Sequence, residues 1–163
     1  MSAILRTETG NPMIRPILTH PDPVLRRKSE PFDAVDAEAR ALLDDMLATM
    51  YGAQGRGLAA VQVGVLRRAV VIDTAWKEGA PEPLFLVNPV ITWASDRLAA
   101  REERCLSIPD TPTTVRRPDQ VRVRYLDRDG TERDQDMTGT LAMVVQHEID
   151  HLDGVLILDH AKA

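Results

Sequence analysis

Two histidines and a glutamate near the C-terminus have the spacing of a metal-binding motif. They lie in the segment Gln146-His-Glu-Ile-Asp-His151, in which His147 and His151 are four residues apart. On a helix, residues at this spacing share one face, so both imidazoles can bind the same metal ion. Glu148 lies beside that face and can act on a water molecule at the metal, first as a general base and then as a general acid.

The segment that carries these residues is predicted to be a helix inside the fold. Apolar residues between Thr140 and Leu152 cover nearly the whole circumference of a helix, which is typical of a buried one. Burying three ionisable groups there without a partner would cost on the order of several kcal/mol. A chance spacing of two histidines is therefore the weaker interpretation, and the sequence predicts a metal site.

A catalytic site of this kind needs a third protein ligand and one open position. The chain has a single cysteine, Cys105, which excludes an intrachain disulfide and makes this residue the natural candidate. A thiolate beside two imidazoles suits Zn or Fe(II). Without the helix motif, Cys105 would be interpreted as a small core residue.

A third segment, residues 55–62, reads Gly-Arg-Gly-Leu-Ala-Ala-Val-Gln. Two glycines followed by small residues let a backbone come close to another segment or to a ligand, although a tight turn after a helix is the simpler interpretation. The longer glycine pattern of a phosphate loop is absent. Gln62 is the polar residue of an apolar run, so it either caps backbone groups or faces a site.

The elements that must position these residues are predicted to be of both kinds. Apolar residues spaced three and four apart predict a surface helix over 36–51, capped by Asp33 or Asp36. A hairpin turn is predicted at 127–130. Strands are predicted at 68–73, 84–88, 90–93, 120–126, 131–137 and 155–158. We therefore expect an α+β fold in which antiparallel strands pack around the central metal-binding helix.

The composition is that of one globular domain. The chain has 163 residues, of which 44% are hydrophobic and 28% charged. We expect a loose extension at 1–13 and a single domain at 14–163. The net charge of −5 argues against direct binding of nucleic acid, and no apolar run approaches the ~20 residues of a membrane span. With no secretory signal and one cysteine, we expect a cytoplasmic protein.

The three segments in this order resemble the peptide deformylase family. Residues 55–62 are similar to the first family motif, G-x-G-L-A-A-x-Q, and residues 103–107 resemble the second, E-G-C-L-S. Residues 146–151 match the third, Q-H-E-x-D-H, including Asp150 before the second histidine. The similarity extends over about residues 14–158 and implies the fold of that family.

The resemblance implies a role for each residue in the motifs. Cys105, His147 and His151 would hold one divalent metal ion, Fe(II) in the cell and Zn or Ni as isolated. Glu148 would take a proton from the water that attacks the formyl carbon of an N-formylmethionyl peptide, and would then protonate the leaving amine. The Gln62 side chain and the backbone N–H of Leu106 would stabilise the oxyanion.

The same resemblance implies the substrate and its binding mode. Gly55, Arg56 and Gly57 would bind a nascent peptide as an added strand, and the products would be formate and a peptide with a free N-terminus. N-formylated nascent peptides near the ribosome are the expected partners of a monomeric enzyme.

Two positions depart from the family pattern. Arg104 stands where the second motif has glycine, and Arg56 stands where the first usually has an aliphatic residue. Both arginines could narrow the pocket or favour an acidic group; alternatively, both point to solvent and pair with Glu102, Glu103 or other acids.

Three functional alternatives to a peptide deformylase stay open at this point. The departures allow a deformylase-like hydrolase with a different, acidic N-acyl substrate. A non-catalytic module that binds peptide or metal is the second alternative. The third is a zinc endopeptidase, against which Cys105 as the third ligand and Asp150 both argue.

Overall fold

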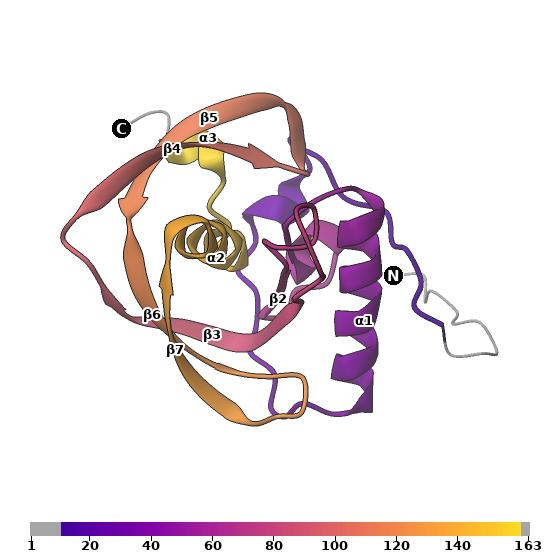
Figure 1. The fold of residues 1–163 in the computed structure, drawn as a ribbon. Helices are drawn as coiled ribbons and strands as arrows, with labels where there is room; N and C mark the ends of the chain where they lie inside the picture. Colours follow the sequence, from indigo (N-terminus) through magenta and orange to yellow (C-terminus); the bar gives the residue numbers. More distant parts are fainter. Residues whose placement is uncertain (1–10, 161–163) are drawn as a thin grey trace.

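Strands enclose one central helix, as Figure 1 shows. The computed structural model describes residues 11–160. Helix α2 (Gly139–Leu152) is seen end-on in the middle of the molecule, and helix α1 (Ala37–Gly52) lies outside the strands. The α+β fold predicted from the sequence is confirmed.

The strands form two separate antiparallel sheets. A five-stranded sheet has the order β1-β2-β3-β6-β7, and β4 pairs with β5 in a two-stranded sheet. The bounds of the strands are β1 (Gly57–Ala59), β2 (Ala69–Ile72), β3 (Leu84–Ala94), β4 (Leu98–Cys105), β5 (Ile108–Pro118), β6 (Gln120–Leu126) and β7 (Glu132–Thr138). The short helical segments are η1 (Pro23–Arg26), η2 (Ala60–Val63) and α3 (Ile157–His160).

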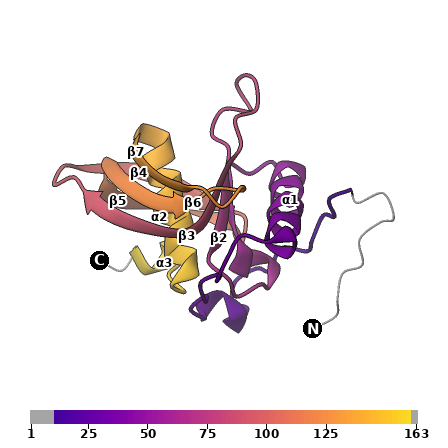
Figure 2. The same cartoon turned by 90° about the horizontal axis from the view of Figure 1, so that it is seen from below.

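Strand β2 separates the two largest parts of the core. All four of its residues are buried, because both faces are covered. Val70 and Ile72 belong to the cluster around α2, whereas Ala69 and Val71 belong to the cluster under α1. Figure 2 shows the same arrangement, with α1 on one side of β2 and α2 on the other. The run of small and β-branched residues at 69–72 suits this doubly covered position.

Both predicted helices are confirmed. Helix α1 begins after Asp36, whose side chain accepts a hydrogen bond of 2.8 Å from the backbone N–H of Ala39. Asp36, and not Asp33, is therefore the N-cap. Helix α2 is buried over most of its surface, as its all-round apolar pattern predicts, and only Thr140 near its start is exposed.

Five of the six predicted strands are confirmed with small shifts at their ends: 68–73, 84–88, 90–93, 120–126 and 131–137. The second and third of these form the single strand β3. Strand β3 runs through Pro89 without interruption, although its pairing with β6 shifts between Val87 and Val90. Asn88 takes a left-handed conformation there, with φ of 52°, and its side-chain amide exchanges two hydrogen bonds of 2.9 Å with the backbone of Phe32.

The predicted strand at 155–158 is wrong. Residues Val155 and Leu156 have no regular structure, and α3 begins at Ile157. The apolar run is buried against Leu25, Ile108 and Val115 and does not pair with a strand. A short apolar run cannot distinguish a buried strand from a buried helical turn, which is the physical reason for the error.

The hairpin of β4 and β5 was not predicted. Most residues of β4 are exposed, so its sequence lacks the alternation of a half-buried strand. Strand β5 contains Pro109, Pro112 and Pro118, which an edge strand tolerates because it need not donate at every position. Long-range pairing with β4 therefore forms this strand in spite of its local sequence.

Part of the predicted extension at 1–13 falls on residues 1–10, which lie outside the described residues. The backbone N–H of Met13 donates a hydrogen bond of 2.9 Å to Asp45 of α1. No helix in the described range, residues 11–160, combines the length and the hydropathy needed to cross a membrane.

Gly154 is a position that only glycine fits. Its φ is +76°, and a Cβ atom there would lie 2.8 Å from the carbonyl carbon of Arg26. We expect Gly154→Ala to lower the free energy of unfolding by about 3–5 kcal/mol, measured by urea unfolding with chelator present. Gly139→Ala is the matched control, because Gly139 has a φ of +59° but open space around it; about 1–2 kcal/mol is expected. Equal losses in the two variants would contradict the predicted clash with Arg26.

Candidate active site

The fold brings the three predicted metal ligands together. Cys105 is the last residue of β4, while His147 and His151 lie one turn apart on α2. The Cys105 sulfur and one nitrogen of each histidine all lie within 4.8 Å of one another, and all three residues are buried. The two histidines lie one turn apart on a helix, as their spacing predicted, and Cys105 at the end of β4 provides the third donor atom.

These donors fit one metal ion. Cys105 Sγ and His151 Nε2 are 3.3 Å apart. Neighbouring ligands of a tetrahedral metal, with bonds of about 2.0–2.3 Å, are separated by about 3.3–3.6 Å. One thiolate and two imidazoles suit Zn or Fe(II) and leave a fourth position open. The residues present therefore meet the requirements of a catalytic metal site.

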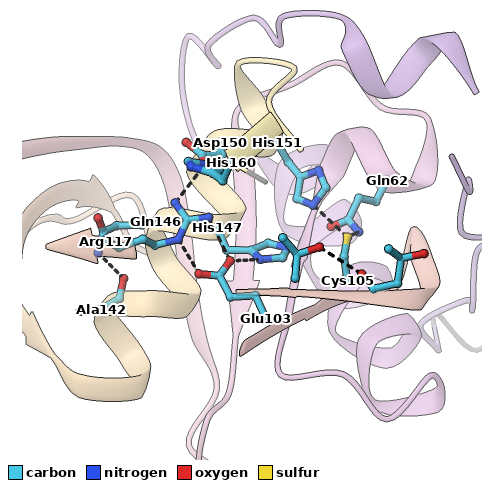
Figure 3. A network of polar contacts seen from close by, with 12 residues as sticks. Gln62, Glu103, Cys105, Arg117, Ala142, Gln146, His147, Asp150, His151 and His160 are labelled. Atoms are coloured by element: carbon cyan, nitrogen blue, oxygen red, sulfur yellow. Dashed lines mark hydrogen bonds and ion pairs between the residues drawn. The ribbon is translucent and has the colours of Figure 1, made fainter. Parts of the chain in front are cut away.

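A network of buried charges holds the first of these histidines (Figure 3). The Nδ1 atom of His147 lies 2.9 Å from Glu103 Oε1, so its Nε2 atom faces the other ligands. Arg117 donates two hydrogen bonds to the same carboxylate, at 2.6 and 3.0 Å. A carboxylate on the far nitrogen fixes the orientation of a ligating imidazole and makes it a better donor.

The network continues to the C-terminal end of α2. Arg117 also donates to Asp150 at 2.9 Å, and His160 Nε2 lies 3.0 Å from the same carboxylate oxygen. Arg117 is only 6% exposed. Asp150 thus helps to neutralise the arginine that supports Glu103. Sequence reasoning missed Arg117, because nothing in its local sequence sets it apart from the neighbouring Arg116.

Glu148 lies against the glycine-rich segment. A Cβ atom at Gly57 would be 2.6 Å from Glu148 Oε2 and 2.8 Å from Val144 Cγ1, so only glycine allows β1 to approach α2 this closely. Gly55 approaches Leu106 in the same way, since a Cβ atom there would be 2.7 Å from Leu106 Cδ1. The two glycines therefore serve close backbone approach, as the sequence suggested.

Gln62 fulfils both of the functions that its sequence position left open. Its Oε1 atom accepts a hydrogen bond of 2.9 Å from the backbone N–H of Ala59, which caps the start of η2. Its Nε2 atom donates to Ser107 Oγ at 3.0 Å and lies 3.7 Å from Cys105 Sγ. The amide is thus held in a fixed position beside Cys105, one of the three predicted metal ligands.

Burial and the neighbouring charged side chains shift the pKa values of Glu148 and His151. Burial raises the pKa of Glu148 to about 7, and its Oε1 atom has no hydrogen-bond partner among the described residues. Burial, together with the charges of His147 and Arg117, lowers the pKa of His151 to about 3, so this imidazole is neutral and can act as a ligand.

His147 and Glu103 behave as a coupled pair. Burial alone would lower the pKa of His147, but the charge of Glu148 and the hydrogen bonds with Cys105 and Glu103 raise it to about 10. Burial would raise the pKa of Glu103, and the hydrogen bonds from His147 and Arg117 lower it overall. A cation between Cys105 and the histidines would compete directly with the proton on His147.

A pocket of about 480 Å³ opens onto these groups. Nine of the ten residues predicted for the site line this pocket. The exception is His151, which is only 1% exposed. Arg56 and Arg104 line the pocket and also pair with acids: Arg104 lies 3.2 Å from Glu102, and Arg56 lies 3.5 Å from Glu78. The arginine departures from the family pattern therefore lie where a substrate would enter.

The loop between β2 and β3 contributes Lys77 to the lining of the pocket, which sequence reasoning missed. Trp76 Nε1 donates a hydrogen bond of 3.0 Å to the carbonyl oxygen of Gly55, and Lys77 lines the pocket. Asp73 holds the start of this loop, because its carboxylate accepts from the backbone N–H groups of Ala75 and Trp76. The polar Asp73 at the end of an apolar strand was the available signal.

Arg117 should support both the fold and the metal ligands. We expect Arg117→Met to lower the free energy of unfolding by about 3–5 kcal/mol, because the buried Glu103 would lose the charge and both hydrogen bonds of Arg117 and keep only His147 as a partner. Metal affinity should fall by about 10–100-fold as His147 loses its fixed orientation. Urea unfolding with chelator and competition with a metal-binding dye measure the two effects. Arg116→Met on the same strand is the control, and an equal loss there would contradict the assignment.

A ligand set with one open position, beside a buried carboxylate at the base of a pocket, defines a metal-dependent hydrolase. The family model of polypeptide deformylase matches residues 14–163. The chain belongs to the polypeptide deformylase family, whose members are metal-dependent enzymes.

Relatives and solved structures agree with this family. The chain is 49% identical over 147 residues to a peptide deformylase of Maricaulis maris, covering 90% of this chain and 84% of the relative. It is similar to the peptide deformylase of Ehrlichia chaffeensis in complex with actinonin, with a TM-score of 0.87, 39% identity, and coverage of 91% and 88%. The chain is also similar to a Met-Ala-Ser-bound peptide deformylase of Acinetobacter baumannii, with a TM-score of 0.84 and 30% identity. This match covers 91% of this chain and 98% of the other.

Proposed function

We propose that this chain hydrolyses the formamide bond of N-formylmethionyl peptides and releases formate. The observation that carries the proposal is the convergence of Cys105, His147 and His151 on one point of a pocket that Glu148 also lines. The family membership supports this reaction over a zinc endopeptidase or a non-catalytic module. The Acinetobacter baumannii relative was solved with Met-Ala-Ser bound. This peptide is the product expected from deformylation of formyl-Met-Ala-Ser.

Cys105, His147 and His151 would hold one divalent metal ion, Fe(II) in the cell and Zn or Ni in preparations exposed to them. When bound, the ion would supply Lewis acidity, which would polarise the formyl carbonyl and make a water molecule more acidic. Glu103 and Arg117 keep His147 oriented for this purpose.

Glu148 carries the proton through the reaction. It takes a proton from water as the water oxygen attacks the formyl carbon, and the carbonyl electrons move onto the formyl oxygen. Glu148 then gives that proton to the peptide nitrogen as the carbon–nitrogen bond breaks. This leaves a free amine and formic acid, which loses its proton to solvent as formate. A pKa of about 7 suits a group that must both accept and release a proton near neutral pH.

The negative charge on the formyl oxygen needs hydrogen-bond donors. The side-chain amide of Gln62 is held by Ala59 and Ser107 and faces the metal ligands. Leu106 follows Cys105 directly, so its backbone N–H lies beside the same point. Donors fixed in advance stabilise developing charge without the cost of reorienting during the reaction.

The peptide would bind along β1. This strand is at the edge of the five-stranded sheet, and the segment from Gly55 to Gly57 lines the pocket. An exposed strand edge offers backbone donors and acceptors to an extended peptide. Arg56 lies in the middle of this segment and Arg104 lies on β4, so both would border the bound peptide.

Nascent chains that still carry their formyl group, near the ribosome in the cytoplasm, are the proposed partners. A monomer suffices for this reaction, because all ten proposed site residues come from one chain.

Formate release tests the proposal. Protein loaded anaerobically with Fe(II) is given formyl-Met-Ala-Ser, with acetyl-Met-Ala-Ser as the matched substrate control. We expect formate from the formylated peptide and no acetate from the other. One metal ion per chain without formate release would overturn the proposal.

A further inference from the structure

We infer that the mouth of the pocket selects formylated peptides that carry an acidic side chain soon after the methionine. The inference rests on the proposed deformylation. It concerns the positive charges of Arg56, Lys77 and Arg104, which line the pocket together. They are called the cationic rim below.

The positive charge of the rim is opposite in sign to the net charge of the chain. The chain has a net charge of −5, yet the rim brings three cations to the entrance of one pocket. Three acids also line the pocket, but Glu103 is neutralised by Arg117 and Glu148 is the buried proton carrier. Glu102 is therefore the one remaining acid of the lining, and Glu78 pairs with Arg56 from outside it. Three cations thus face two acids, and the rim keeps an excess of one positive charge. A positive entrance attracts and retains negative substrate groups.

The present partners of the two arginines are easily displaced. Arg104 and Glu102 are 77% and 58% exposed, and Glu78, the partner of Arg56, is 77% exposed. Exposed pairs of this kind contribute little, so a substrate carboxylate can compete for either arginine. In addition, Arg56 Nε is buried and has no hydrogen-bond partner among the described residues. The observed position of Arg56 therefore leaves one donor of its guanidinium unsatisfied.

The rim is attached to the segment along which the peptide would bind. Arg56 lies between Gly55 and Gly57, and its carbonyl oxygen accepts a hydrogen bond of 2.9 Å from the backbone N–H of Asp73. Trp76 is bonded to Gly55, and Lys77 Nζ lies 5.6 Å from the centre of the Trp76 ring. Arg56 and Lys77 are thus positioned by the same pair of segments. Since the formyl group must reach Glu148, the residues after methionine are the ones that pass the rim.

A set of peptides tests this inference. The kcat/KM for formyl-Met-Asp-Ser and formyl-Met-Ala-Asp is compared with that for formyl-Met-Ala-Ser and formyl-Met-Lys-Ser at low ionic strength. We expect at least one acidic peptide to exceed the alanine peptide by about 5-fold or more, and the lysine peptide to be the poorest. The preference should shrink as salt is raised, because the rim is exposed.

Variants assign the preference to the rim. Arg104→Glu should remove or reverse the ratio between the aspartate and lysine peptides, and Glu102→Gln should increase it by freeing Arg104. Arg124→Ala is the matched control, since Arg124 has an exposed acidic partner, Glu132, but lies on β6 outside the pocket lining. The ratio should not change in that variant.

The outcomes separate this inference from the proposed function. Turnover of formyl-Met-Ala-Ser with equal kcat/KM for all four peptides overturns the acidic preference and leaves deformylation standing. A preference that persists unchanged in Arg104→Glu and in Arg56→Ala overturns its assignment to the rim. No turnover of any formylated peptide by the Fe(II) protein overturns the proposed function itself.

Discussion

Glu148→Gln should reduce kcat/KM for formyl-Met-Ala-Ser by about 10²–10⁴-fold, the range usual for loss of a general acid–base group. Glutamine has nearly the same shape, so it can occupy the space of Glu148 beside Gly57. It cannot accept the proton of the attacking water or return one to the leaving nitrogen. Formate release under anaerobic conditions with Fe(II) measures the loss.

Two controls show that the effect is on proton transfer. Metal content should remain at one ion per chain, because Glu148 is not among the three ligands that converge. The thermal midpoint should not fall, since Glu148 Oε1 makes no hydrogen bond with the described residues. Activity within about 10-fold of the parent would mean that another group carries the proton. Loss of metal in this variant would equally count against the assignment.

Removal of the thiolate should have a comparably large effect for a different reason. Cys105→Ala leaves two imidazoles as the only protein ligands among the three that converge, and two ligands do not hold a metal ion with catalytic affinity. We expect less than about one tenth of a metal ion per chain and at least about 100-fold lower formate release. Metal analysis after gel filtration and the formate assay measure these quantities.

Reconstitution distinguishes loss of the metal from loss of the fold. The parent protein, stripped with chelator, should regain activity and thermal stability when Fe(II) or Zn is added, because the ion binds the folded chain. Cys105→Ala should gain neither. The substitution removes one sulfur from the small cluster around Leu25 and Ile108, so the variant should still fold. Full recovery of activity on adding metal would exclude Cys105 as a ligand.

The sequence could predict the chemistry of the site because its key spacing is local. His147 and His151 are one helical turn apart, and the apolar residues around them require that the helix be buried. Glu148 and the close approach of Gly57 followed from the same short motifs. The two main helices and the strands at 68–73, 120–126 and 131–137 also have periodic patterns that depend on neighbours in the chain alone.

The tertiary structure decided everything that depends on distant residues. Cys105 meets His151 across 46 positions in the chain, and Arg117 meets Asp150 across 33. The β4–β5 hairpin has a weak local pattern and forms through pairing of its two strands. Residues 155–158 have the apolar pattern of a strand, but they do not pair with one and lead into α3.

The same division applies to the pocket itself. Residue type and spacing determined which groups could bind a metal ion and move a proton, because a helix fixes the relative positions of nearby side chains. Only packing between β1, β4 and the loop after β2 decided that Arg56, Lys77 and Arg104 share one pocket entrance. Contacts of that kind arise when separate elements meet to bury their apolar faces, and no local pattern encodes them.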